Sequence, residues 1–188
     1  MHIIDYENTK IAIGDIKYHT PDGAAFIPYN IDGYTVSVLG IAGTLSMTND
    51  LSNYSIDRLY LPSTIEQIGH HYLQDNMQFK IFFCNKPIDL FDLNQSLWLS
   101  ETITIYVPSE YYDGYVEINQ YKQFCKANVC YYFNIDEDDY YYVDYYEEEG
   151  LIEFIPPSPT REGYTFDGWY KEPDFVNKWN FVNILSTI

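Results

Sequence analysis

Residues 59–73, with the sequence LYLPSTIEQIGHHYL, contain the pattern that decides the fold. Leu59 and Leu61 flank a tyrosine, and this alternation of period two is typical of a strand. Pro62 has no backbone N–H to donate and has a fixed φ, so we expect the strand to end before it. One such unit cannot bury its apolar face alone, but stacked copies share a continuous core. The stretch therefore predicts one rung of a repeating structure.

The order apolar residue, proline, polar residue recurs at Pro28 and Pro108. Pro62 and Pro108 are 46 residues apart, which is twice 23, and Asn85 lies halfway between them. A fourth, degenerate rung fits at that point. Pro28 precedes Pro62 by 34 residues, which is one period of 23 plus 11. We interpret the surplus as a loop insertion at the polar stretch 48–55.

Three stretches resemble the BspA-like leucine-rich repeats of bacterial surface proteins: IPYNIDGYTVSVLG (27–40), the opening stretch (59–73) and ITIYVPSEYYDGYVEINQY (103–121). The resemblance covers about residues 25–126 and departs from the family pattern at the third rung and at 48–55. It implies a short, irregular leucine-rich-repeat solenoid as the first domain, residues 1–128.

The third stretch resembles the terminal rung of such arrays, where a strand ending in Val-Pro precedes a helix. The resemblance implies a capping helix at about 110–126 that includes Tyr112, Tyr115, Tyr121 and Phe124. Their spacing suits one helical face.

Residues 1–24 predict a strand pair ahead of the first rung. Ile11, Ile13 and Ile16 alternate along the chain, and Pro21-Asp22-Gly23 has the chemistry of a turn.

After Cys130 the chain changes to tyrosine-rich strands mixed with acidic residues. Strands are expected at 131–135, 140–146 and 151–155, and the prolines of 156–159 form a stiff connector.

The string PTREGYTFDGWY (159–170), followed by KWNF (178–181), strongly resembles the InlB B-repeat, or Listeria–Bacteroides repeat, a small β-grasp-like module of surface proteins. The resemblance spans about residues 129–182 and implies a second domain at 129–188, without the last strand of the family. The whole chain is therefore expected to be β-rich with a minor helical part.

The residues of this string also have a physical interpretation. Tyr164 and Phe166 are expected on one face of a strand, and Gly168 predicts a bulge that directs Trp169 toward the core. Trp179 should pack against it. We interpret both tryptophans as structural, with a platform for a sugar or a cation as the alternative.

The charge of the chain excludes several classes of partner. Its formal net charge is −18, from 28 acidic and 10 basic residues, which repels nucleic-acid phosphates and anionic membrane surfaces. No apolar run approaches the roughly 20 residues of a membrane helix. The start lacks the features of a signal peptide. The chain is therefore expected to be either cytoplasmic or an internal piece of a larger exported bacterial protein, at the cell surface or secreted, and the repeat motifs favour the internal piece.

Cysteine is sparse, and an odd number of three is no disulfide framework. We expect Cys84, Cys125 and Cys130 to be free, partly buried thiols; a local bridge between Cys125 and Cys130 is the alternative.

The sequence gives only weak support for catalytic or metal-binding residues. His70 and His71 follow Glu66 by about one helical turn, but no third metal ligand is evident. The acidic runs 136–139 and 147–149 lack the spacing and the glycine of a calcium loop, and solvated hairpin ends explain them better. The sequence contains no nucleotide-binding loop and no GxSxG nucleophile elbow of a hydrolase. We therefore predict no enzyme activity, no metal site and no cofactor.

These features favour a non-catalytic interaction module that acts in protein–protein adhesion or as a spacer, with a protein ligand on a host or neighbouring cell. Two alternatives stay open. One is a carbohydrate-binding accessory module of a secreted enzyme, and the other is a purely structural stalk segment. The binding residues are not predicted, although the strand face of the solenoid and the tyrosine-rich hairpins are the expected surfaces.

Overall fold

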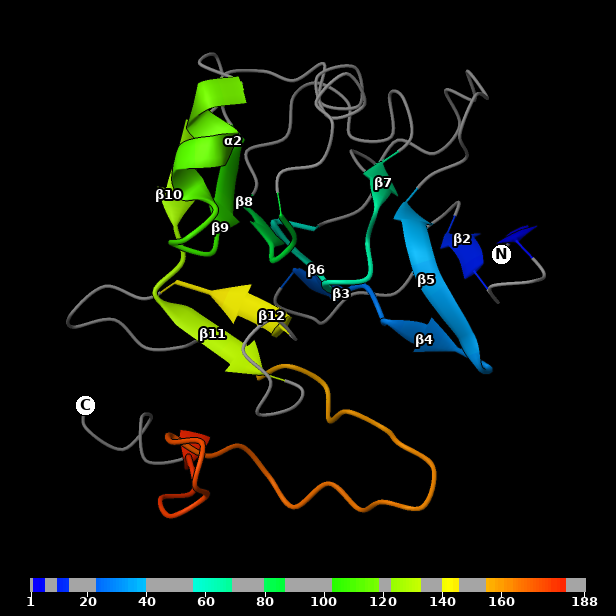
Figure 1. The fold of residues 1–188 in the computed structure, drawn as a ribbon, viewed down its shortest axis with the longest axis vertical. Coiled ribbons are helices and arrows are strands. Elements are labelled where there is room, and N and C mark those ends of the chain that lie inside the picture. Colours follow the sequence, from blue (N-terminus) through cyan, green and yellow to red (C-terminus); the bar gives the residue numbers. More distant parts are fainter. Residues whose placement is uncertain are drawn as a thin grey trace.

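The structure is a computed structural model, which describes residues 2–5, 10–13, 23–39, 56–68, 80–86, 103–118, 123–132, 140–145 and 155–181 (Figure 1). The predicted β-rich class with a minor helical part is confirmed, because these residues form twelve strands and one helix. No helix in these ranges is long and apolar enough to cross a membrane. The predicted insertion at 48–55 lies outside the described residues.

The centre of the fold is a parallel sheet of five strands in the order β10-β9-β8-β6-β3. Its strands are β3 (Ala24–Phe26), β6 (Arg58–Leu61), β8 (Lys80–Phe83), β9 (Thr104–Val107) and β10 (Gln123–Lys126). The residues paired across neighbouring strands are offset by 34 (Ala24 to Arg58), 22 (Arg58 to Lys80), 24 (Lys80 to Thr104) and 19 (Thr104 to Gln123) positions. The strands predicted before Pro62, near Asn85 and before Pro108 are thereby confirmed.

A second sheet lies beside the first and contains the N-terminal strands. Its members are β1 (His2–Asp5), β2 (Lys10–Ile13), β4 (Asn30–Ile31), β5 (Tyr34–Leu39) and β7 (Gln67–Ile68). β5 pairs in parallel with β2 and with β7, so this sheet also joins segments that are distant in sequence. The antiparallel pair of β1 and β2 lies within residues 1–24, where a strand pair is predicted, while Ile16 and the turn residues Pro21 and Asp22 lie outside the described residues.

The two sheets enclose one aliphatic core. The inward residues of the five-stranded sheet include Leu59, Leu61 and Ile81, and Val36 and Leu39 reach the same cluster from β5. Their alternation with residues on the opposite face is the predicted period-two pattern. Burial of this continuous apolar surface is the main favourable term in the stability of the fold.

The opposite face of the five-stranded sheet is aromatic. Phe26, Tyr60, Phe82 and Tyr106 lie on neighbouring strands, and their ring planes are within about 10° of parallel. The centroid distances along this series are 4.3, 4.5 and 4.9 Å. In-register parallel strands bring equivalent side chains close together, so one ring per strand forms a continuous stack. We call these four rings the aromatic ladder.

A hairpin of two antiparallel strands, β11 (Val129–Tyr132) and β12 (Tyr140–Asp144), covers the aromatic ladder (Figure 1). Tyr142 packs edge-on against Phe26 and Tyr60, and its hydroxyl donates to the Ile27 carbonyl at 2.7 Å. These two strands confirm two of the tyrosine-rich strands predicted after Cys130. Most of the third, at 151–155, lies outside the described residues.

The predicted helix at about 110–126 is too long. The observed helix α2 spans Tyr112–Ile118, and Phe124 lies in strand β10 instead. Residues 123–126 form a strand rather than a helix because pairing with β9 satisfies the backbone hydrogen bonds of both segments. Phe124 still enters the aliphatic core. Tyr115 faces the core as predicted, and its hydroxyl donates to the carbonyls of Asn85 and Lys86. Tyr121 lies outside the described residues.

The segment 155–181 departs most from the predicted strands. Tyr164 and Phe166 lie in irregular backbone, and the only pairing found within this segment is an isolated bridge between Tyr170 and Lys178. Gly168 adopts φ +134°, which an L side chain rarely takes, and a Cβ there would meet the Lys178 side chain. Ring contacts rather than sheet pairing therefore organise these residues. The β-grasp-like arrangement stays a prediction.

The first testable prediction concerns the stacking of the rungs. Leu59→Ala removes a fully buried side chain between two neighbouring strands, so we expect the free energy of unfolding to fall by about 2–5 kcal/mol. Urea unfolding followed by circular dichroism measures this change. Tyr164→Ala is the control, because Tyr164 is 68% exposed and its loss should change the free energy by about 0.5 kcal/mol or less. Equal effects of the two substitutions would contradict the described core.

Candidate ligand-binding surface

Of the three residues in the weak metal-site candidate, the structure describes only Glu66. The Lys10 ammonium pairs with the Glu66 carboxylate, with 2.7 Å between Nζ and Oε1. His70, His71 and the acidic runs 136–139 and 147–149 lie outside the described residues. Within the described ranges, no three His, Cys, Asp or Glu side chains gather in a way that could hold a metal ion.

Both tryptophans of the C-terminal string are half-buried and packed against other residues. Trp169 contacts Tyr131 and Tyr141 of the hairpin, with ring centroids 5.1 and 5.7 Å apart. It therefore points toward the core, as predicted. Trp179 is tied to it through the backbone, since its N–H donates to the Trp169 carbonyl at 2.7 Å. The hairpin therefore covers the Trp169 ring, whereas the Trp179 ring lies 6.0 Å from the Phe181 ring and 5.6 Å from the Lys171 ammonium.

The strand face of the parallel sheet is not open at the aromatic ladder. Tyr60 and Phe82 are almost fully buried, because the hairpin β11–β12 lies on them. The chain covers these two rings with its own tyrosines, so they offer no surface to a partner. Binding by the rest of the strand face stays a prediction.

A buried carboxyl group ties the hairpin to the ladder. Asp144, at the end of β12, is only 2% exposed. It accepts a hydrogen bond from the Tyr60 hydroxyl at 3.2 Å and from the Tyr145 N–H at 2.7 Å. Burial, and then the Asp144 charge, raise the pKa of Tyr60 above its usual value. Sequence analysis missed Asp144, because an acidic residue at the end of a tyrosine-rich strand has no distinguishing pattern.

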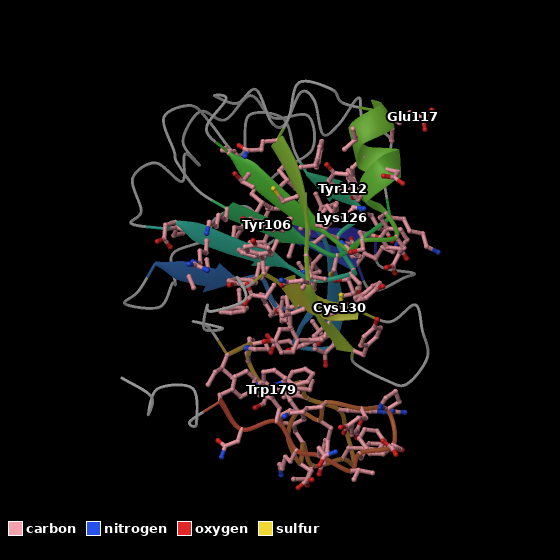
Figure 2. The ribbon with its side chains drawn as sticks, turned by 90° about the vertical axis from the view of Figure 1, so that its left-hand side faces the viewer. Tyr106, Tyr112, Glu117, Lys126, Cys130 and Trp179 are labelled. Carbon is pink, nitrogen blue, oxygen red and sulfur yellow. The ribbon has the colours of Figure 1, made fainter. Side chains whose placement is uncertain are left out.

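An open hollow of about 350 Å³ lies where the aromatic ladder ends. Its lining consists of Tyr106, Tyr112, Phe124, Cys125, Lys126 and Tyr145. Figure 2 shows Tyr106, Tyr112 and Lys126 near one another on the side formed by β9, β10 and α2. The Lys126 ammonium lies 4.9 Å from the centroid of the Tyr112 ring. Nothing in the sequence pattern pointed to this hollow, because its residues come from four separate segments.

The three cysteines are free thiols, as predicted. Cys84 is buried, and its thiol donates to the Leu61 carbonyl at 3.2 Å. Burial raises the pKa of Cys130 to about 11, with a smaller contribution from Glu110. The thiolate is the reactive form of cysteine, so Cys130 is poorly suited to nucleophilic chemistry.

Comparison with known protein families gives one match, which covers the C-terminal part of the chain. Residues 132–187 match the family model of the Listeria-Bacteroides repeat domain, which includes the tryptophans and most of the hairpin. This match indicates a module of extracellular bacterial surface proteins. No curated protein matches the chain. No solved structure matches it either.

The buried tyrosines predict a loss of stability at high pH. Burial raises the pKa of Tyr60, Tyr115, Tyr131 and Tyr142, and it raises the pKa of Tyr141 to about 12. The unfolded chain releases these protons near pH 10, so above that value the folded state binds more protons than the unfolded state. We expect the free energy of unfolding to decrease from about pH 10 through pH 12.

Urea unfolding at a series of pH values, together with tyrosinate absorbance, tests this dependence. The buried tyrosines should ionise only as the chain unfolds. Complete ionisation near pH 10 with the fold intact would show that these rings are not buried as described.

The Tyr60–Asp144 contact gives a separate prediction. Tyr60→Phe keeps the ring in the ladder but removes the donor to the buried carboxyl group, so we expect a loss of about 1–3 kcal/mol in the free energy of unfolding. Tyr34→Phe, at a half-buried position in β5, is the matched control and should cost about 0.5 kcal/mol or less. Denaturant unfolding of both variants measures the difference, and equal costs would argue against the contact.

Proposed function

We propose that this chain is a non-catalytic interaction module of a bacterial surface or secreted protein, which acts in protein–protein adhesion or as a spacer. The observation that carries the proposal is the match of residues 132–187 to the Listeria-Bacteroides repeat domain, together with the packing of that segment onto the parallel sheet. The ligand would be a protein on a host or neighbouring cell.

The proposal includes a BspA-like leucine-rich-repeat solenoid at residues 1–128. The parallel sheet supports it, because four of its five strands each contribute inward aliphatic side chains and one outward aromatic ring, at offsets of 34, 22 and 24 residues. Stacked units of this kind depend on nearest-neighbour contacts. The second proposed domain, residues 129–188, begins with the hairpin that covers the ladder.

The junction between the two proposed domains favours a rigid module. Tyr142 and Asp144 bind the hairpin to Ile27 and Tyr60, which lie more than 80 positions earlier in the chain. A further long-range hydrogen bond joins the Tyr29 hydroxyl to the Thr160 carbonyl. Buried contacts of this kind resist hinge motion, so a load applied to the chain would pass from the repeat segment into the sheet.

The adhesive surface we propose lies on the repeat segment. Tyr164 and Val176 are each 68% exposed, and Phe175 is 56% exposed. Tyrosine is enriched among the anchors of protein interfaces, and exposed apolar side chains that gather on one surface mark interaction sites, while the acidic remainder of the chain maintains solubility and favours neutral or cationic partners.

An adhesion assay tests this function. Beads coated with the chain should bind epithelial cells or co-resident bacteria, and the double variant Tyr164→Ser/Val176→Ser should reduce binding at least about threefold, because it removes two exposed anchors. Flow cytometry measures the bound fraction. Ile118→Ser, at a 44% exposed position on α2, is the control and should bind like the unaltered chain.

Failure of the unaltered chain to bind either kind of cell would contradict the adhesive role. The spacer role would then be tested by limited proteolysis at the junction near residue 128. Resistance in the unaltered chain and cleavage in Tyr142→Ala would support a rigid spacer, whereas rapid cleavage of both would contradict it.

A further inference from the structure

The aromatic ladder ends at Tyr106, because the next strand has no ring at the paired position. Tyr106 on β9 pairs in register with Cys125 on β10, so the next strand supplies a short side chain where the others supply a ring. Tyr145, just after β12, tilts against Tyr106 with 5.1 Å between the ring centroids. The space beside these residues is the hollow of about 350 Å³. The hollow lies where Cys125 has a short side chain in place of an aromatic ring.

The hollow has a charge that is rare in this chain. The chain has 28 acidic and 10 basic residues, yet the described residues that line the hollow include Lys126 and no acidic residue. A second ammonium, that of Lys80, lies 6.0 Å from the Tyr106 centroid. Among the residues that the structure describes, no carboxylate pairs with Lys126. An anionic group is therefore the ligand group that this position favours.

The remaining walls are aromatic. Tyr112 and Tyr145 are half-buried and line the hollow together with Phe124 and Tyr106. Tyrosine combines an apolar ring with a hydroxyl that can donate or accept, which suits a ligand with both C–H and O–H groups. The Tyr112 ring also holds the Lys126 ammonium in place through a cation–π contact. The volume is at the lower end of the range for small-molecule pockets.

We propose that this hollow binds one acidic sugar residue, a uronic acid of a glycan, with its carboxylate on the Lys126 ammonium and its ring C–H groups against Tyr112 and Tyr145. The open mouth of the hollow suits a residue that remains attached to a longer chain. This site is separate from the exposed side chains of the repeat segment, so the assignment goes beyond the proposed adhesion role and does not depend on it.

Methyl glucuronide is the probe for the test, and methyl glucoside is its neutral counterpart. Titration calorimetry and saturation-transfer NMR should show binding of the glucuronide to the full chain. Lys126→Gln should weaken that binding about tenfold or more, which is about 1.4 kcal/mol, because the variant keeps the hydrogen-bonding reach of the side chain but removes its charge. Tyr112→Leu should also weaken it.

The chain provides a matched control for these variants. Lys171 lies 5.6 Å from the Trp179 ring centroid, a similar ammonium–ring contact remote in sequence from the hollow. Lys171→Gln should bind the glucuronide like the unaltered chain, and circular dichroism should confirm that every variant folds.

Three results would overturn the assignment: no binding of the glucuronide by the unaltered chain, equal binding of the glucoside, or unchanged binding by Lys126→Gln. Preference for a short peptide with a free C-terminal carboxylate over the glucuronide would also overturn it. If the beads bind cells but the chain does not bind the glucuronide, the adhesion role stands and this site does not.

Discussion

The stack of four aromatic rings is the contact on which the remaining structure depends. Parallel pairing places Phe26, Tyr60, Phe82 and Tyr106 one above another, and the same register aligns the aliphatic side chains on the inner face. A shift of one residue in any strand would exchange the two faces. The ladder and the aliphatic core therefore enforce the same register from opposite sides of one sheet.

The ladder also explains why the hairpin packs on the five-stranded sheet. A row of exposed rings is a large apolar surface, and such surfaces rarely remain uncovered in a soluble chain. Tyr142 of β12 covers it with edge-on contacts and donates to the Ile27 carbonyl, while the Tyr140 hydroxyl donates to the Glu110 carboxylate. This layer thus buries its rings and gives partners to the Tyr140 and Tyr142 hydroxyls, while the buried Tyr131 hydroxyl has none among the described residues. The arrangement accounts for part of the unusual abundance of tyrosine, 21 of 188 residues.

Sequence analysis predicted the parts of the fold in which a local signal and the tertiary structure agree. The strand before Pro62 was predictable, since alternation and proline chemistry act within a few residues. The end of α2 was not, because pairing with β9 draws the chain around Phe124 into the sheet. The hollow was not predictable either, because it follows from a missing ring at Cys125 and from side chains that only the folded chain brings together.

The uneven spacing of the strands determines where this chain tolerates changes in length. Paired residues on neighbouring ring-bearing strands are separated by as few as 22 and as many as 34 positions, yet the rings remain stacked at 4.3 to 4.9 Å. The connections therefore absorb length differences of at least 12 residues, the difference between 34 and 22, without disturbing the stack. Insertions and deletions should accumulate between the strands and be excluded from the strands of three or four residues that contain the rings.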